Sequence, residues 1–297
     1  MSVTVRVPAK VNVQLAVGPA RPDGFHDLAN VFLAVSLYDR VTATRAESLR
    51  VTCEGPDADQ VPLDRTNLAA RAAELLAARY GIAPDVHLHI AKDIPVAGGM
   101  AGGSADGAGA LLACDALWGT GASRAELLDI CAELGSDVPF SLVGGAALGT
   151  GRGEHLTELP LGGTFHWVFA VADGGLSTPA VYAEFDRLTP TAPAPAASPG
   201  LLDALRTGDT AALAGALAND LQPAALSLRP SLADTLAAGT AAGALAGIVS
   251  GSGPTTAFLV KDAEAARSVA AALVASGTCR TARTATSPAQ GARIVPD

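Results

Sequence analysis

The chain has 297 residues, of which 49% are hydrophobic and 16% are charged, so it can build a large core and is not expected to be disordered. Its net charge of −9 excludes a general electrostatic attraction to nucleic acid or to an anionic membrane. Its apolar stretches stay shorter than the roughly 18 residues of a membrane-spanning helix.

The start of the chain and the spacing of the cysteines indicate where in the cell the protein is expected. Arg6, Lys10 and Asn12 interrupt the first apolar stretch, so no secretory signal is predicted and a cytoplasmic protein is expected. No Cys-x-x-Cys pair occurs, which argues against a zinc site and a redox motif and favours reduced, mostly buried thiols. The four cysteines are Cys53, Cys114, Cys131 and Cys279.

Hydrophobic periodicity predicts the elements of the first half of the chain. Strands are expected over 3–17, 31–41, 49–53 and 86–90, with Pro8 indicating an edge position or a bulge in the first. Helices are expected over 68–80, 105–118 and from Ser123 to about residue 134. Asn67 and Gly81 delimit the first of these helices, and Ser123 with Glu126 forms a capping box.

The second half differs in composition and element order. Strands are expected over 165–172, 247–249 and 256–260, and helices over 201–205, 211–217, 231–238 and 263–276. A Pro/Ala-rich surface loop is expected over 189–200. Because strands and helices do not alternate regularly, the pattern predicts an α+β protein. The length of the chain favours two domains over one.

A glycine-rich segment between a predicted strand and a predicted helix is the strongest local signal. Glycines allow close backbone approach, and a helix N-terminus offers unpaired N–H groups to a phosphate. The segment therefore predicts an ATP-phosphate loop, although a flexible connector is the alternative; it matches neither the Walker nor the dinucleotide form. Its residues are Pro95, Val96, Ala97, Gly98, Gly99, Met100, Ala101, Gly102, Gly103, Ser104 and Ala105.

Other candidate residues are ambiguous when each is taken alone. Asp137 follows a predicted helix, where a carboxylate is more often a local turn former than a catalytic group. Lys10 lies in an apolar strand pattern and either reaches solvent at an edge or binds an anion. His26 and Phe25 lie in a turn-rich loop, and the small residues over 249–255 allow either a close approach or a tight turn.

Three motifs in chain order resemble those of the GHMP kinase superfamily. They are Pro8-Ala-Lys-Val-Asn12, the glycine-rich segment, and Ser250-Gly-Ser-Gly-Pro254. More narrowly, Arg21-Pro-Asp-Gly-Phe-His-Asp-Leu28 and Leu134-Gly-Ser-Asp-Val-Pro-Phe140 resemble members that act on a cytidine-containing metabolite. The resemblance implies a ribosomal-protein-like N-terminal domain, 1–153, and a ferredoxin-like C-terminal domain, 154–297, with the active site between them.

The resemblance also implies an activity and roles for individual residues. ATP, with Mg²⁺, would phosphorylate the 2-hydroxyl of a cytidine diphosphate-linked polyol in the non-mevalonate route to isoprenoid precursors. Lys10 and Asp137 match the catalytic pair, with the carboxylate accepting the hydroxyl proton and the ammonium offsetting developing charge. Asn12, Phe25, His26 and Tyr182 match substrate-binding positions, while the metal ligands remain unassigned. The partners are small molecules, with no nucleic acid or membrane, and the oligomeric state is open.

Two departures and two alternatives accompany this interpretation. Phe25 stands where the family commonly has Tyr, and Ala105 stands where it often has a second serine, which removes one hydroxyl from the loop. A GHMP kinase acting on another alcohol, such as mevalonate or homoserine, is the first alternative. A non-catalytic nucleotide-binding regulator is the second, and the presence of both Lys10 and Asp137 argues against it.

Overall fold

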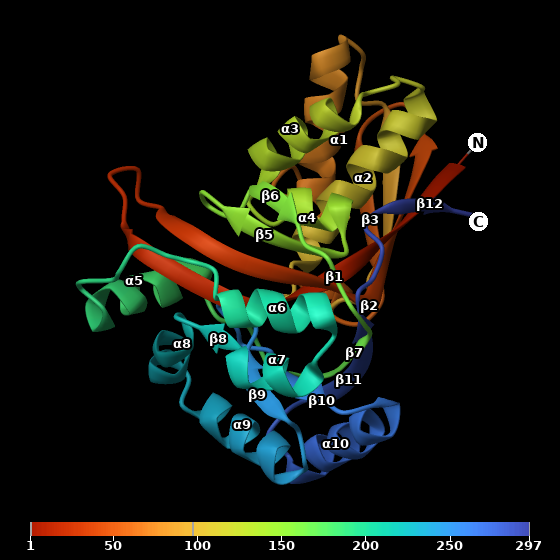
Figure 1. The fold of residues 1–297 in the computed structure, drawn as a ribbon. Coiled ribbons are helices and arrows are strands. Elements are labelled where there is room, and N and C mark those ends of the chain that lie inside the picture. Colours follow the sequence, from red (N-terminus) through yellow and green to blue (C-terminus); the bar gives the residue numbers. More distant parts are fainter. Residues whose placement is uncertain (1, 97, 297) are drawn as a thin grey trace.

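The computed structural model describes residues 2–96 and 98–296, and it arranges them around two β-sheets (Figure 1). The first sheet has the order β12-β1-β2-β4-β3, with β5 on β2, β6 on β5 and β8 on β1. Its strands are β1 (Ser2–Ala20), β2 (His26–Arg45), β3 (Arg50–Glu54), β4 (Val86–Ala91), β5 (Ala146–Thr150), β6 (His155–Glu158), β8 (Ala218–Asn219) and β12 (Arg293–Val295).

The second sheet has the order β11-β7-β10-β9 and is antiparallel throughout. Its strands are β7 (Phe165–Val171), β9 (Ala246–Val249), β10 (Thr256–Val260) and β11 (Thr281–Ser287). The first and third strands in chain order lie in the middle, and helices connect β7 to β9 and β10 to β11, which is ferredoxin-like connectivity. The predicted α+β class and the ferredoxin-like second half are confirmed.

Helices cover both sheets. They are α1 (Leu68–Tyr80), α2 (Gly102–Trp118), α3 (Arg124–Leu134), α4 (Val138–Val143), α5 (Thr178–Leu188), α6 (Pro199–Thr207), α7 (Thr210–Ala216), α8 (Gln222–Leu228), α9 (Ser231–Ala241) and α10 (Ala263–Ser276), with a 3-10 turn at Ala58–Gln60. In the described residues, no helix is long and apolar enough to cross a membrane.

A long hairpin of β1 and β2 forms the centre of the first sheet and carries several site residues. The two strands pair from Ser2 and Thr44 to Ala20 and His26, with register shifts on the way. One shift falls between Pro8 and Ala9, where the pairing moves from Tyr38 to Val35, so the ladder is irregular at the predicted position. Helices α1 and α2 pack against each other, α2 packs on the hairpin, and the large core forms between them.

Local signals located several helix ends. The side chain of Asn67 accepts a hydrogen bond from the backbone N–H of Ala69, and the capping box of Ser123 and Glu126 is present. The sequence analysis predicted neither α4 nor α5, and each of these helices begins one residue before a proline, Pro139 or Pro179. Proline is tolerated in a first helical turn, where its missing N–H has no partner to lose.

The last strand returns to the first sheet. Thr4 pairs with Val295 across β1 and β12, and the two chain ends lie near each other in Figure 1. Strand β6 also joins this sheet, although it follows Gly153. The division of the chain at Gly153 stays a prediction.

Candidate active site

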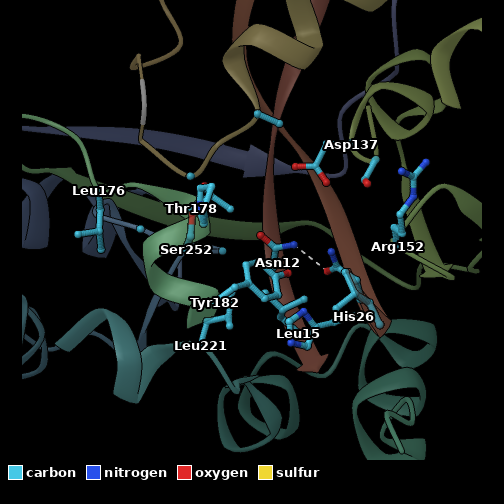
Figure 2. Close-up of a pocket in the computed structure, with 18 of the residues that line it drawn as sticks. Asn12, Leu15, His26, Asp137, Arg152, Leu176, Thr178, Tyr182, Leu221 and Ser252 are labelled. Carbon is cyan, nitrogen blue, oxygen red and sulfur yellow. Dashed lines mark hydrogen bonds between the residues drawn. The ribbon is translucent and has the colours of Figure 1, made fainter. Parts of the chain in front are cut away.

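A cavity of about 730 Å³ opens between the β1–β2 hairpin, the start of α2 and helix α5 (Figure 2). The turn between β5 and β6 and the segment 251–253 complete its walls. The predicted catalytic and substrate residues all line it: Lys10, Asn12, Phe25, His26, Asp137 and Tyr182. The structure therefore brings together residues that lie more than half the chain apart.

Part of the predicted ATP loop reaches the cavity. Gly98, Gly99, Ala101, Gly102, Gly103 and Ser104 line it. Met100 and Ala105 are buried in the core, so they support the loop from behind. Pro95 and Val96 do not line the cavity, and Ala97 lies outside the described residues.

Two distant segments hold the loop in place. The backbone N–H of Lys10 donates to the carbonyl of Met100 at 3.2 Å, and Ser250 Oγ donates to the carbonyl of Gly99 at 3.1 Å. Gly99 has a φ of +74°, and a Cβ there would lie 2.2 Å from the carbonyl oxygen of Ser250. Only glycine fits this crossing, because any side chain would collide with backbone.

The N-terminus of α2 faces the cavity without a side-chain cap. Its N-cap, Ala101, adopts a left-handed conformation and makes no capping hydrogen bond. The first N–H groups of this long helix are therefore available, and the helix dipole favours an anion beside them. Phosphate is a suitable ligand for such a position.

Lys10 and Asp137 face each other in the cavity. Lys10 Nζ lies 3.4 Å from Asp137 Oδ2; the lysine side chain is 6% exposed and the aspartate side chain 31%. Asp137 is the N-cap residue of α4, but its carboxylate makes no capping hydrogen bond. The turn-former alternative is therefore not supported, because the carboxylate is directed at a cation and the cavity instead.

A polar chain extends from Lys10 along the hairpin. Lys10 Nζ donates to Asn12 Oδ1 at 2.6 Å, and Asn12 Nδ2 donates to Asn30 Oδ1 at 2.7 Å (Figure 2). All three side chains are buried, so these bonds orient the ammonium and the amides. Sequence reasoning missed Asn30, for which a polar residue in an apolar strand was the available signal.

His26 lies at the opposite end of the cavity among aromatic rings. Its Nε2 is 2.8 Å from Asp186 Oδ1, and its ring centroid is 5.0 Å from that of Tyr182. Burial, and with it the nearby Asp137 carboxylate, raises the pKa of Tyr182, so this phenol stays protonated. Phe25 is 49% exposed, and the guanidinium of Arg152 lies 4.9 Å from its ring centroid.

Arg152 and Asp186 are the charged cavity residues that sequence reasoning missed. Arg152 lies in the turn between β5 and β6, and Asp186 lies one helical turn after Tyr182 on α5. The sequence around each residue contains no pattern that would distinguish a site residue from an ordinary charged residue on the surface. Their roles depend on which distant segments they meet.

A second lysine cluster lies beneath the glycine loop. Lys92 Nζ donates to Asp39 Oδ2 at 2.5 Å and to Asp106 Oδ2 at 2.8 Å, and all three side chains are buried. Burial raises the pKa of Asp106 to about 8. The nearby charge of Asp39 raises this pKa further, whereas the charge of Lys92 lowers it. A Cβ on Gly102 would lie 2.9 Å from Lys92 Nζ, so the cluster touches the start of α2.

Comparisons with known proteins agree with this geometry. Residues 67–145 match the family described as GHMP kinases N terminal domain, and residues 201–278 match GHMP kinases C terminal. A 4-diphosphocytidyl-2-C-methyl-D-erythritol kinase of Streptomyces avermitilis is 80% identical, over 99% of this chain and 100% of the relative. One of Thermobifida fusca is 61% identical, over 99% of this chain and 98% of the relative.

A crystal structure of 4-(cytidine 5'-diphospho)-2C-methyl-D-erythritol kinase superposes with a TM-score of 0.77. It is 33% identical, with 95% of this chain and 98% of that chain covered. Fold, motif order and full-length similarity therefore agree. The chain belongs to the GHMP kinases and, within them, to the 4-diphosphocytidyl-2-C-methyl-D-erythritol kinase family.

Proposed function

We propose that this kinase transfers the γ-phosphoryl group of ATP to the 2-hydroxyl of 4-diphosphocytidyl-2-C-methyl-D-erythritol, giving the 2-phosphate and ADP. The reaction belongs to the non-mevalonate route to isoprenoid precursors. One observation carries the proposal: the Lys10–Asp137 pair lies in a cavity that has a helix N-terminus on one side and aromatic rings around a histidine on the other. A phosphate donor and a base-containing acceptor can thus approach the same carboxylate.

ATP binds with its phosphates at the start of α2. Gly102, Gly103 and Ser104 present backbone N–H groups there, and Gly98 and Gly99 allow the chain to approach closely. Ser250 and Gly253, from the second half of the chain, lie against Gly99 of the loop. Positioning at this end contributes much of the rate acceleration, because phosphoryl transfer depends mainly on alignment and electrostatics.

Asp137 is the general base, and Lys10 stabilises charge. The carboxylate accepts the proton of the 2-hydroxyl as that oxygen bonds to the γ-phosphorus, and the bond to the ADP oxygen breaks. The ammonium of Lys10, held by Asn12 at 2.6 Å, offsets negative charge that develops beside it. Asn12 and Asn30 keep this ammonium directed at the reaction centre.

The cytosine base binds between the aromatic side chains, and His26 reads its edge. Because a carboxylate only accepts, the contact with Asp186 keeps the hydrogen of a neutral His26 ring on Nε2. Nδ1 is then an acceptor, which matches the 4-amino group of cytosine and opposes the 4-oxygen of uracil. Tyr182 and Phe25 provide apolar faces for the base; the missing phenol at Phe25 does not remove this face.

Mg²⁺ would accompany ATP, and the residues present fit it. In the described residues, no group of three or more histidines, cysteines or acids could hold a metal alone. Mg²⁺ commonly needs only one or two protein ligands besides phosphate oxygens and water. The hydroxyl of Ser104, which lines the cavity at the start of α2, would hold it together with the phosphate oxygens, and it would neutralise charge on the phosphates.

Location and partners follow from the same proposal. The four cysteines are free, which suits a reducing cytoplasm. The partners are two small molecules, ATP and the cytidyl substrate, and no nucleic acid or membrane is required.

Direct turnover tests the proposal. Purified protein with Mg·ATP and the cytidyl substrate should yield ADP and a singly phosphorylated product, identified by mass spectrometry. Mevalonate and homoserine serve as competing acceptors, and a uridyl analogue tests the contact to the base. Turnover of either competing alcohol in preference to the cytidyl substrate would refute the substrate assignment.

A further inference from the structure

We propose that Arg152 binds the diphosphate bridge of the nucleotide substrate and thereby makes the enzyme select a cytidine diphosphate over an uncharged cytidine. This inference rests on the proposed function, because it places the bridge between the base and the reacting hydroxyl. It adds a specificity-determining residue to the substrate side of the cavity. Figure 2 shows Arg152 at the wall of the cavity near Asp137 and His26.

The charges around the cavity single out Arg152. In the described part of the chain, the charged residues of the lining are Lys10, Asp137, Arg152 and Asp186. Lys10 pairs with Asp137, and Asp186 pairs with His26. Arg152 is thus the cavity cation that is not engaged with a carboxylate of the lining, and a diphosphate needs such a partner.

The surroundings of Arg152 leave its fork of donors free for a ligand. Nε lies 3.6 Å from Glu154 Oε1, and the backbone N–H of Arg152 donates to Glu154 Oε2 at 2.6 Å. Within the described residues, neither Nη atom makes a hydrogen bond, and the side chain is 35% exposed. Glu154 therefore orients one edge of the guanidinium, and the other edge can take two phosphate oxygens.

The turn that carries Arg152 contacts residues next to both His26 and Asp137. The backbone N–H of Leu28, two residues after His26, donates to the carbonyl of Gly151 at 2.8 Å. On the other side, a Cβ on Gly153 would lie 3.8 Å from the Cβ of Ser136, which precedes Asp137. The turn thus spans the distance between the base-reading residue and the general base, where the bridge must pass.

The contact with Phe25 supports the same position. The Arg152 guanidinium lies 4.9 Å from the Phe25 ring centroid, a cation–π contact that limits its movement. A base that stacks near Phe25 would carry its 5' phosphates past this guanidinium. The α2 N-terminus serves the phosphates of ATP, so the two anionic groups have separate partners.

Binding measurements on the full-length protein test this inference. The Kd values of cytidine diphosphate, cytidine and ATP are measured by calorimetry for wild type, Arg152→Gln and Arg152→Lys, with EDTA present so that no metal bridges the phosphates. Arg152→Gln should weaken cytidine diphosphate about 10- to 100-fold, the range for losing charge-assisted hydrogen bonds, and should leave cytidine and ATP unchanged. Arg152→Lys should recover part of the lost affinity for cytidine diphosphate, because an ammonium keeps the positive charge but lacks the paired donors of a guanidinium.

A matched variant controls for overall charge. Arg65→Gln removes the same charge from a side chain that is 86% exposed and lies outside the cavity lining, and it should change none of the three constants. If Arg152→Gln weakened the binding of cytidine and of cytidine diphosphate equally, Arg152 would only position Phe25, and the inference would be overturned. Weaker ATP binding would also overturn it. If wild type binds neither cytidine ligand, the proposed function itself fails.

Discussion

Two of the three lysines in the chain are buried beside aspartates, one beneath the glycine loop and one facing the cavity. Lys92 lies between Asp39 and Asp106, and the three side chains are at most 3% exposed. Lys10 lies 3.4 Å from Asp137, whose side chain is 31% exposed. The same residue types therefore form a sealed cluster in one place and an open pair in the other.

The two clusters contain the same residue types but differ in how far a ligand can reach their carboxylates. Solvent access therefore distinguishes a lysine–aspartate contact that supports the fold from one that can take part in chemistry. The sealed cluster joins β2, the residue after β4 and the first turns of α2, so it braces the start of that helix. Its protons cannot reach a substrate. The open pair leaves a carboxylate oxygen within reach of the cavity, and only this pair can exchange a proton with a bound hydroxyl.

The largest expected effect is on catalysis at the open pair. Asp137→Asn should lower kcat by a factor of about 10² to 10⁴, because it removes the proposed proton acceptor. ATP affinity and the melting temperature should stay close to wild type, since the carboxylate caps no helix. Asp129→Asn, at a side chain that is 72% exposed on α3, is the control in a steady-state assay. Near-normal turnover of Asp137→Asn would contradict the assignment.

Breaking the sealed cluster should act on stability. Lys92→Met leaves Asp39 buried without its cation, and the free energy of unfolding should fall by about 3–5 kcal/mol. Urea denaturation followed by circular dichroism measures this change. Lys261→Met, at the exposed third lysine, should be nearly neutral. A small loss in Lys92→Met would show that the cluster does not brace the fold.

The sealed cluster should also make stability depend on pH. The pKa of Asp106 rises from its ordinary value of 3.8 to about 8, chiefly through burial. The folded state then holds this proton more tightly than the unfolded state, so its stabilising contribution is complete below about pH 4 and is lost as pH rises through about 8. Denaturation at about pH 5 and about pH 8 should show the loss in wild type.

The variant Asp106→Asn tests whether this pH dependence of stability comes from Asp106. The variant cannot ionise at that position, so its free energy of unfolding should change less between the two pH values than that of wild type. Asp39 and Lys92 remain to face the new amide. An unchanged pH dependence in Asp106→Asn would assign the effect to other groups.

The smallest expected effect compares adjacent glycines at the start of α2. Gly102→Ala places a methyl group 2.9 Å from Lys92 Nζ, which two carboxylates hold, and should cost about 1–3 kcal/mol. Gly103→Ala meets nothing closer than Leu68 at 3.9 Å and should stay within about 0.5 kcal/mol of wild type. Thermal denaturation measures both variants. Equal behaviour would mean that Lys92 moves freely and does not transmit strain to the loop.

The sequence by itself determined the elements whose signals are local. Helix α1 begins after the predicted cap Asn67 and ends at Gly81, and α10 has the predicted bounds. The order of the three motifs indicated the kinase superfamily, and Lys10, Asp137 and His26 lie in one cavity as expected. These features succeed because caps, periodicity and glycine runs act over a few neighbouring residues.

Tertiary structure alone decided which charges meet. Lys92 contacts Asp39 and Asp106 from separate elements, and Arg152 faces the cavity only because β5 and β6 pair beside β2. In the sequence alone, Arg152 in its glycine-containing turn cannot be distinguished from an ordinary surface charge. The fold places its guanidinium over the ring of Phe25. Burial and through-space distance set the pKa of Asp106 and the access of Asp137, and neither quantity is encoded in a short stretch of sequence.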